Sequence, residues 1–302
     1  MDSNRKQWFI LFSVLIGTFL ILGLFGREIY RKAPPIPERV VTDAGEKVWS
    51  KDDILDGQLA WQSMGGMQVG TIWGHGAYQA PDWSADWLHR EAVALLEIVA
   101  EERFGGNYDS LEVEEQAGVD RLVKQELRKN TFDEDTGTLT ISAQRAAAIK
   151  SISQHYLSLF GDDPSLKGLR EDYAIADNSV PDLERRQNIT AFFFWTAWAC
   201  TTERPDSTVT YTNNWPHEPL VGNQPTSANI LWSIISIVLL IAGIGALVWY
   251  KSFRDKEEDA PPPPASDPLD ALTLTPSMRA VWKYVVVVLG LFALQVGLGA
   301  IL

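Results

Sequence analysis

Three apolar runs constrain the fold of this chain more than any other feature of its sequence. They lie at Trp8–Phe25, Ile230–Tyr250 and Tyr284–Leu302, and none of them contains an acidic or basic residue. A helix that crosses the hydrocarbon part of a bilayer needs about 20 mostly apolar residues. The runs therefore predict a membrane protein, mainly α, whose long polar middle part lies outside the bilayer.

The runs divide the chain into five parts. We predict a transmembrane anchor at 1–26, an extracytoplasmic helical domain at 27–228, a transmembrane helix at 229–250, a cytoplasmic linker at 251–280 and the start of a further transmembrane helix at 281–302. A cleavable signal peptide would share the basic start and apolar core of the first run, but Phe25–Glu28 offers no small-residue cleavage site. The third run reaches the last residue without a polar anchor, so we expect the sequence to be truncated.

Charges beside the second run predict the orientation. Lys251, Arg254 and Lys256 follow it directly, and short loops rich in Lys and Arg stay in the cytoplasm. Basic residues after the first run argue the other way, but they head a long domain, and long domains cross the membrane largely regardless of charge. The domain is therefore expected on the periplasmic or extracytoplasmic side of a bacterial inner (cell) membrane, in a multi-pass protein.

Composition excludes several classes of protein. The net charge of −13 and the pI near 4.8 argue against a nucleic-acid-binding protein, which would carry a basic patch. The single cysteine, Cys200, excludes an intrachain disulfide, a CxxC zinc site and the CxxCH attachment of a c-type haem. We interpret Cys200 as an inert, packed thiol.

Apolar residues at helical spacing predict three helices in the middle part. The first spans 84–104 and stops at Gly105, the second spans 111–130, and the third follows a Ser142 cap and ends at Gly161. Between the second and third, 132–141 contains turn residues and is predicted to be a small hairpin or loop. The inward faces of the three helices are Leu88, Ala92, Leu95 and Val99, then Val119, Leu122, Val123 and Leu127, then Ala146, Ile149, Tyr156 and Phe160.

A fourth helix, Pro181–Thr202, begins polar and becomes strongly apolar. Its apolar part, NITAFFFWTAWACTT, is too short to cross a bilayer and is rich in aromatic residues, which collect at membrane surfaces. We expect this helix to lie against the membrane or against membrane-embedded protein. Glu203–Gln224, which follows it, is predicted to be a loop.

The stretch Trp73–Glu91, WGHGAYQAPDWSADWLHRE, combines a loop with the start of a helix. Two glycines and Pro81 exclude regular structure in its first half, and Asp82 or Ser84 can cap the helix that follows. Composition alone favours a rigid structural loop.

The sequence contains no recognisable active site. The four histidines, at 75, 89, 155 and 217, do not stand at a metal-binding spacing, and P-loop, dinucleotide, zincin and nucleophile-elbow motifs are missing. The predicted spans carry no histidine, so they cannot bind haem iron through imidazole. We therefore predict no catalytic and no cofactor-binding residue.

Two long motifs nevertheless carry a resemblance to a known family. The order of anchor, WGHGAYQAPDWSADWLHREA, helical domain, YTNNWPHEPLVGN and second span resembles the N-terminal part of the large subunit of quinol-dependent, single-chain bacterial nitric oxide reductases. The resemblance covers almost the whole chain. It implies a cytochrome c-like domain without haem, followed by the first transmembrane helices of a haem-copper oxidase-like core. Members of the family reduce two NO to N2O and water with electrons from quinol, in denitrification or NO detoxification.

The resemblance also implies cofactors. The complete enzyme would carry haem b, haem b3, non-haem iron and, as a further candidate, calcium. The iron ligands and the quinol pocket would lie in spans beyond Leu302, so the chain alone is expected to bind no haem and to be inactive. Gly57–Gly70 stands where related two-subunit enzymes carry CxxCH, and its Met64 and Met67 are then packing residues.

A calcium site is the one metal site that the resemblance implies for this chain. In the two-subunit relatives the Gly and Tyr of the GAY loop help to hold a calcium ion between haem propionates. That role would carry over to Gly76 and Tyr78, because calcium prefers oxygen ligands. The alternative is that both residues only shape the loop.

Expected partners are the lipid bilayer, the remainder of the catalytic core and, in the complete enzyme, quinol. No nucleic-acid partner is expected, and a second copy of the chain, in a homodimer, is a further candidate partner. Two other functions compete: a membrane-tethered extracytoplasmic sensor, and a structural or binding module without enzymatic activity. A sensor would need a cytoplasmic signalling domain, whereas Lys251–Pro276 has the composition of a linker.

Overall fold

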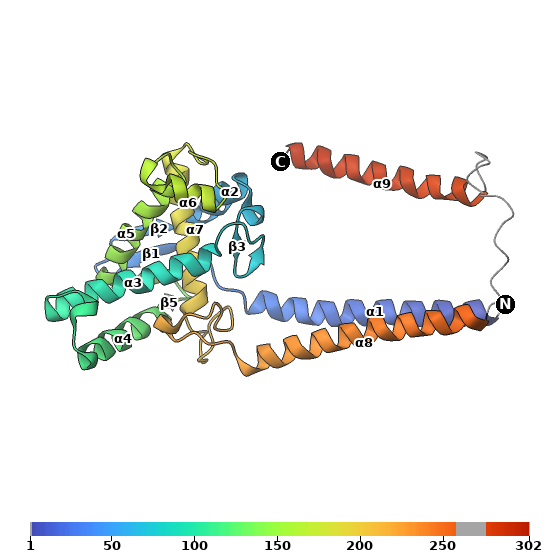
Figure 1. Cartoon of the computed structure of the whole chain (residues 1–302), viewed down its shortest axis with the longest axis horizontal. Coiled ribbons are helices and arrows are strands. Elements are labelled where there is room, and N and C mark those ends of the chain that lie inside the picture. Colours follow the sequence, from blue (N-terminus) through green and yellow to red (C-terminus); the bar gives the residue numbers. More distant parts are fainter. Residues whose placement is uncertain (1, 258–275, 302) are drawn as a thin grey trace. The chain divides into compact units, whose positions relative to one another are not determined.

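A computed structural model describes residues 2–257 and 276–301 of the chain. The chain falls into two compact units, Met1–Ile235 and Ser236–Leu302. Figure 1 gives the order of the elements. The domain that follows the first apolar helix belongs entirely to the first unit.

The described residues form helices and a few short strands. The α-helices are α1 (Asp2–Arg31), α2 (Lys51–Ser63), α3 (Trp83–Phe104), α4 (Val113–Arg128), α5 (Ala143–Leu159), α6 (Lys167–Asp172), α7 (Leu183–Thr201), α8 (Ser227–Glu257) and α9 (Pro276–Ile301). Single 3-10 turns are η1 (Gly66–Gln68), η2 (Tyr108–Ser110), η3 (Pro164–Leu166) and η4 (Pro219–Val221). The strands are β1 (Arg39–Thr42), β2 (Lys47–Ser50), β3 (Thr71–Ile72), β4 (His75–Gly76), β5 (Phe132–Asp133) and β6 (Thr138–Ile141).

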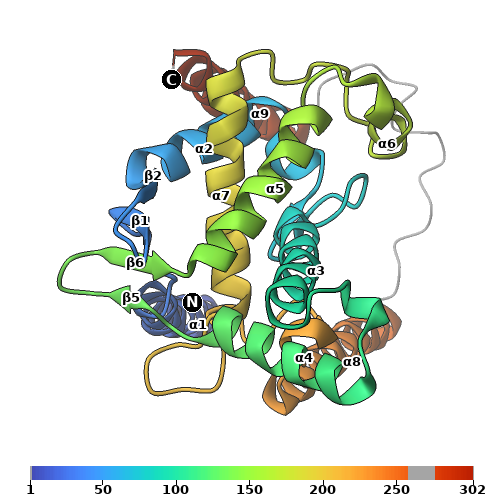
Figure 2. The ribbon, with the colours of Figure 1, turned by 90° about the vertical axis from the view of Figure 1, so that its left-hand side faces the viewer.

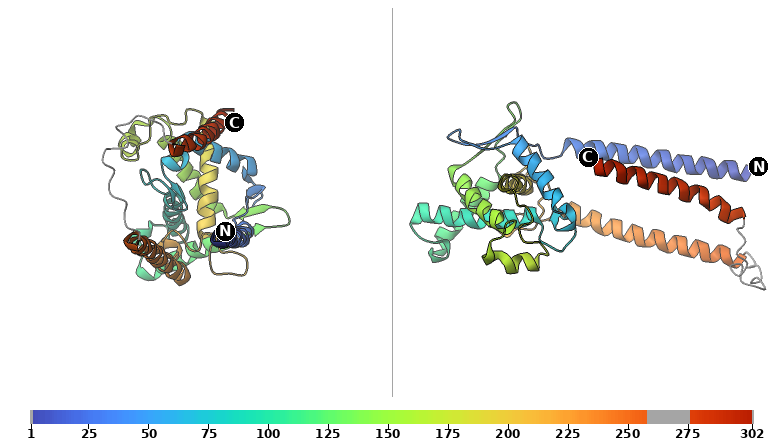
Figure 3. Two further views of the ribbon diagram at one scale, coloured as in Figure 1. Left: turned by 90° about the vertical axis from the view of Figure 1, so that its right-hand side faces the viewer. Right: turned by 90° about the horizontal axis from the view of Figure 1, so that it is seen from above.

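Helix α7 is the centre of the domain. It runs between α2 on one side and α3 and α5 on the other (Figure 2), and the view along its axis in Figure 3 shows it surrounded by them. Twelve of its 19 residues are buried. The expectation that this segment lies against the membrane is therefore wrong. An all-round apolar helix suits a protein interior as well as a membrane surface, and here the domain is thick enough to enclose it.

Aromatic rings fill the space around α7. Trp83 of α3 stacks on Phe193 with ring centroids 5.4 Å apart, and Trp87 stacks on Tyr156 at 5.2 Å. One ion pair is buried beside them, since Arg145 Nε donates to Glu91 Oε1 at 2.6 Å. The stacked rings let α3, α5 and α7 pack closely, and the pairing of Arg145 with Glu91 means that neither buried charge is left alone.

The helices predicted from apolar spacing agree with α3, α4 and α5. Asp82 is the N-cap of α3 and accepts from Ala85 N at 3.0 Å, while Ser142 caps α5. Gly105 ends α3 with φ of 69°. The inward placement of Leu122 is wrong, because its side chain is 38 % exposed at the edge of the buried face of α4.

A four-stranded sheet was not predicted in full. Its order is β2-β1-β6-β5, with β1 and β6 parallel and the other pairs antiparallel. The hairpin predicted at 132–141 is confirmed as β5 and β6. Strands β1 and β2 were not predicted because each has only four residues, too few for a clear alternating pattern. In addition, β1 pairs with a strand far along the chain, with Val40 opposite Leu139.

Within the described residues, two helices are long and apolar enough to cross a membrane, at Trp8–Arg31 and Ser227–Arg254. They agree with the first two predicted spans, although α1 extends without a break to Arg31, beyond the boundary predicted at residue 26. Helix α9 covers the third apolar run. Most of the predicted linker lies at 258–275, outside the described residues.

Candidate functional site

Two loops that carry the unusual motifs lie side by side, and we name them by their sequences. The GAY loop is Gly70–Asp82, and the NNWP loop is Glu203–Gln224. Their exposed surface, together with the end of α1, is called the two-loop face. Tight turns and hydrogen bonds fix the conformation of each loop.

A tight hairpin forms the first half of the GAY loop. β3 pairs with β4 in antiparallel register, Ile72 opposite His75. Trp73 and Gly74 make the turn with φ of 53° and 77°. Two positive φ values fit the two-residue turn that matches strand twist, and glycine adopts them without strain.

Asp82 joins the two halves of the GAY loop. Its Oδ2 accepts from Gly74 N at 2.7 Å and from the Thr71 hydroxyl, and its Oδ1 accepts from the Ser84 hydroxyl and caps α3. Ser84 in turn accepts from Trp73 N at 3.0 Å. The alternative caps expected from the sequence are therefore resolved: Asp82 is the cap, and Ser84 supports it.

Glycine is required at position 76 by the domain itself. Its φ is 141°, and a Cβ there would lie 2.5 Å from Gly70 O and 2.9 Å from Met67 O. Ala77 N donates to the same Met67 carbonyl at 2.7 Å. Any side chain at 76 would therefore force the hairpin away from η1.

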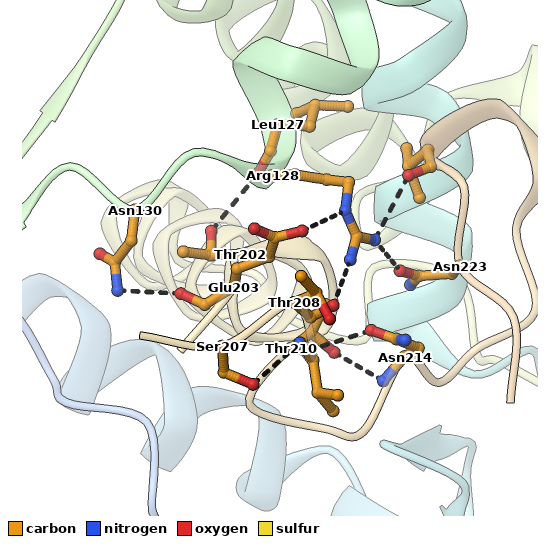
Figure 4. A network of polar contacts seen from close by, with 12 residues as sticks. Leu127, Arg128, Asn130, Thr202, Glu203, Ser207, Thr208, Thr210, Asn214 and Asn223 are labelled. Atoms are coloured by element: carbon orange, nitrogen blue, oxygen red, sulfur yellow. Dashed lines mark hydrogen bonds and ion pairs between the residues drawn. The ribbon is translucent and has the colours of Figure 1, made fainter. Parts of the chain in front are cut away.

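Arg128, at the end of α4, contacts several parts of the NNWP loop (Figure 4). Its Nε donates to Glu203 Oε1 at 2.9 Å, its Nη1 to Asn223 Oδ1 at 3.0 Å and its Nη2 to Thr208 O at 2.9 Å. Asn223 also donates to Cys200 O at 2.9 Å. One guanidinium thus ties the start, middle and end of the loop together. Sequence reasoning missed Arg128, since an arginine in the last turn of a helix is common and signals only a favourable helix dipole.

The middle of the NNWP loop is a sharp turn. Asn213 and Asn214 have φ of 57° and 60°, and the Trp215–Pro216 peptide is cis. Thr210 and Asn214 exchange hydrogen bonds, from Thr210 N to Asn214 Oδ1 at 3.1 Å and from Asn214 N to Thr210 Oγ1 at 2.7 Å. Asparagine tolerates the left-handed region better than other non-glycine residues, which explains the Asn pair of the motif.

The NNWP loop contacts both the GAY loop and α3. The Trp215 ring packs against Gly74, where a Cβ would lie 3.2 Å from the ring. The His89 ring of α3 and Glu218 Oε2 are 2.9 Å apart. The loops and the end of α1 enclose a hollow with a volume of about 710 Å³, whose lining includes Phe25, Ile29, Lys32, Trp73, Arg204 and Trp215.

Gly76 and Tyr78 stand at the surface of the GAY loop. The Tyr78 side chain is 89 % exposed. Among the described residues no three His, Cys, Asp or Glu side chains gather closely enough to hold a metal ion. Calcium takes six to eight oxygen ligands. Gly76 and Tyr78 could supply only a small part of such a shell, so a calcium ion at this loop would need most of its oxygen ligands from other groups.

Part of the stretch Gly57–Gly70 is packed against the central helix. Gly57 of α2 touches the backbone of α7 so closely that a Cβ would lie 1.9 Å from Asn188 O. The Trp61 ring lies 5.5 Å from the Phe192 ring. Met64 packs on the core as predicted, but Met67 is 54 % exposed, so its predicted packing role is wrong.

Cys200 is buried in the last turn of α7, as predicted for a packed thiol. Burial raises the pKa of the Cys200 thiol well above its ordinary value. A thiol that stays protonated is neither a nucleophile nor a metal ligand at neutral pH.

The fold and the face define a class: a membrane-anchored helical domain with a rigid, two-loop surface beside its anchoring helix. The family model of the NorB cytochrome c-like domain, from nitric oxide reductase, matches residues 37–217. The match covers more than half of the chain, which therefore belongs to this family, and with its two candidate spans it is a membrane protein. No curated protein matches the chain.

Proposed function

We propose that this chain is the N-terminal region of a quinol-dependent nitric oxide reductase, and that its two-loop face docks on the catalytic membrane part of that enzyme. The family match over residues 37–217 carries the proposal. The reaction is the reduction of two NO to N2O and water. The chain contributes an anchor, a rigid domain and the docking face, and the iron ligands come from outside it.

Quinol as the electron source is supported by the chemistry of this chain. A domain that passed electrons from a soluble cytochrome would need a haem of its own, and c-type attachment needs CxxCH. Here the only cysteine is Cys200, which is buried, and Gly57 and Trp61 pack directly on α7. A domain without haem suits an enzyme whose electrons arrive within the membrane.

Docking is supported by the rigidity and exposure of the two-loop face. Asp82 and Arg128 fix its two loops, yet Tyr78 projects almost fully into solvent. A large exposed aromatic side chain on a rigid support is typical of a contact site. Gly76 and Tyr78 would then shape the contact, and calcium would need most of its ligands from the other side.

Tyr78→Ala in the complete enzyme tests the proposal. Because Tyr78 is 89 % exposed, its loss should leave the stability of the domain within about 0.5 kcal/mol of the native value. We expect NO consumption driven by quinol to fall by roughly tenfold, the effect of losing a contact worth about 1.4 kcal/mol. Gly76→Val should lower turnover further, since it also distorts the hairpin.

Val113→Ala is the matched control, because Val113 is 73 % exposed at the start of α4, away from both loops. It should leave NO consumption unchanged. A Tyr78→Ala enzyme with full quinol-driven activity and normal haem content would refute docking through this face. Turnover with a reduced soluble cytochrome but not with quinol would refute the quinol assignment.

A further inference from the structure

Arg204, in the NNWP loop, is a partly buried cation without a counter-ion among the described residues. Its Nη2 donates to Tyr211 O at 2.7 Å, while its Nε is buried and has no hydrogen-bond partner. Burial lowers the pKa of Arg204. A partly desolvated charge with an unused donor is costly unless an anion approaches it.

The hollow that Arg204 lines lies where the candidate spans leave the bilayer. Phe25 and Ile29, near the end of the span Trp8–Arg31, form its apolar side and are 66 % and 72 % exposed. Asn229, near the start of the span Ser227–Arg254, lies on its edge. With both candidate spans across a bilayer, the hollow would lie at the depth of the lipid headgroups.

The remaining walls suit a lipid headgroup. Trp73 and Trp215 contribute aromatic rings, which favour the interface between headgroups and acyl chains. Trp73 is fixed, because its Nε1 donates to Thr196 O at 2.9 Å. Lys32 adds a second cation, shared with Glu28 at 2.9 Å. The volume of about 710 Å³ lies within the range of small-ligand sites, roughly 300–1,000 Å³.

We propose that this hollow binds one anionic phospholipid of the surrounding membrane. Its phosphate pairs with the Arg204 guanidinium, its glycerol backbone lies against Trp73 and Trp215, and an acyl chain follows Phe25 and Ile29 along α1. An anionic headgroup is favoured over a zwitterionic one, since Arg204 lacks an internal counter-ion among the described residues. The site uses the anchor and both loops, but it does not depend on the proposed docking, which rests on Tyr78, a residue outside the lining of the hollow.

Lipid binding by the delipidated full chain tests the site. Native mass spectrometry would follow titration with phosphatidylglycerol and, separately, phosphatidylcholine. We expect the native chain to bind one phosphatidylglycerol, at least about fivefold more tightly than phosphatidylcholine. The affinity of Arg204→Gln for phosphatidylglycerol should be lower by about tenfold or more, the scale of one charge-assisted hydrogen bond. Arg103→Gln, at an exposed arginine in the last turn of α3, should bind like the native chain.

Arg204→Gln also loses the bond to Tyr211 O, so a variant outside the loop is needed. Lys32→Gln, on α1, should lower the affinity for phosphatidylglycerol by about two- to threefold, because an exposed charge is screened by solvent. Equal binding by native chain and Arg204→Gln, or no preference for phosphatidylglycerol, would overturn the proposal. Displacement of the lipid by millimolar inorganic phosphate would assign the site to a free anion instead. If the complete enzyme bound no lipid here, the hollow would instead be assigned to a protein segment of that enzyme. None of these outcomes bears on NO turnover.

Discussion

Asp82 uses both of its carboxylate oxygens within the GAY loop, and this single side chain decides whether the loop and α3 stay together. Its Oδ2 serves the hairpin, through Gly74 N and Thr71, and its Oδ1 serves the helix, through Ala85 N and Ser84. A carboxylate can accept several hydrogen bonds at once, whereas an amide would present a donor to these donors.

Asp82→Ala is expected to destabilise the domain by roughly 2–4 kcal/mol, because it removes a helix cap and leaves Gly74 N without a partner. Asp82→Asn should recover only part of the loss. Urea unfolding of the full chain in detergent, followed by tryptophan fluorescence, measures both. Lys150→Ala, at an exposed residue of α5, should change the free energy of unfolding by less than about 0.5 kcal/mol. A native-like Asp82→Ala would mean that backbone pairing alone holds the loop.

His155 makes the stability of the domain depend on pH. Its Nε2 is buried without a partner, and burial lowers the pKa of the imidazole, helped by the positive charge of Arg90 and opposed by Asp86. The ordinary pKa is 6.5. As the pH falls through that value, the unfolded chain takes up a proton before the folded one does. The contribution of His155 is therefore complete above about pH 6.5 and is lost below it.

His155→Gln should lessen the loss of unfolding free energy between pH 7.5 and pH 5 by roughly 0.5 kcal/mol, a small figure because partial exposure screens the charge. Thermal melts at the two pH values provide the comparison. His75→Gln, at an exposed histidine, serves as the control and should keep the native pH dependence. The same pH dependence in His155→Gln and in the native chain would assign it to the carboxylates.

At the scale of elements, regular spacing predicted α3, α4 and α5, because each shows one apolar face to the core. Helix α7 was predicted as a helix but assigned to the wrong surroundings, since a segment apolar on all sides does not distinguish protein from membrane. Both motif loops were recognised as unusual. Their meeting was not predicted, because contacts such as Gly74 with Trp215 join positions far apart in the sequence and follow no local pattern.

Helices α2 and α7 approach each other closely at Gly57. A Cβ at this position would lie 1.9 Å from Asn188 O, so the helices must separate to admit it. Gly57→Ala is expected to cost roughly 3 kcal/mol or more in unfolding free energy, since overpacking against backbone cannot be relieved by a rotamer change. Gly118→Ala, in α4, has nothing within 4 Å of its new Cβ and should stabilise the domain by about 0.5–1 kcal/mol. Equal stability of the two variants would contradict this packing.

At the scale of the whole molecule, the positions of the two candidate spans bear on topology. The hollow of the two-loop face is lined by the last turns of the span Trp8–Arg31 and by Asn229 at the start of the span Ser227–Arg254. We therefore expect the chain to leave and re-enter the bilayer on one side, with the domain between. Its N-terminus and Lys251 are then expected together on the opposite side. The basic residues there, Arg5 and Lys6 before the first span and Lys251 and Arg254 at the end of the second, favour the cytoplasm for that side.

Single cysteines test this orientation in intact cells. Asp135→Cys lies in the exposed turn between β5 and β6, and Asp267→Cys lies in the linker. Cys200 can be kept, because it is buried and burial raises the pKa of its thiol, so it should not react. An impermeant maleimide should label the cysteine at 135 and leave the one at 267 unlabelled until the membrane is opened. Labelling of 267 alone would place the domain in the cytoplasm, and equal labelling of both before opening would mean that Ser227–Arg254 does not cross the membrane.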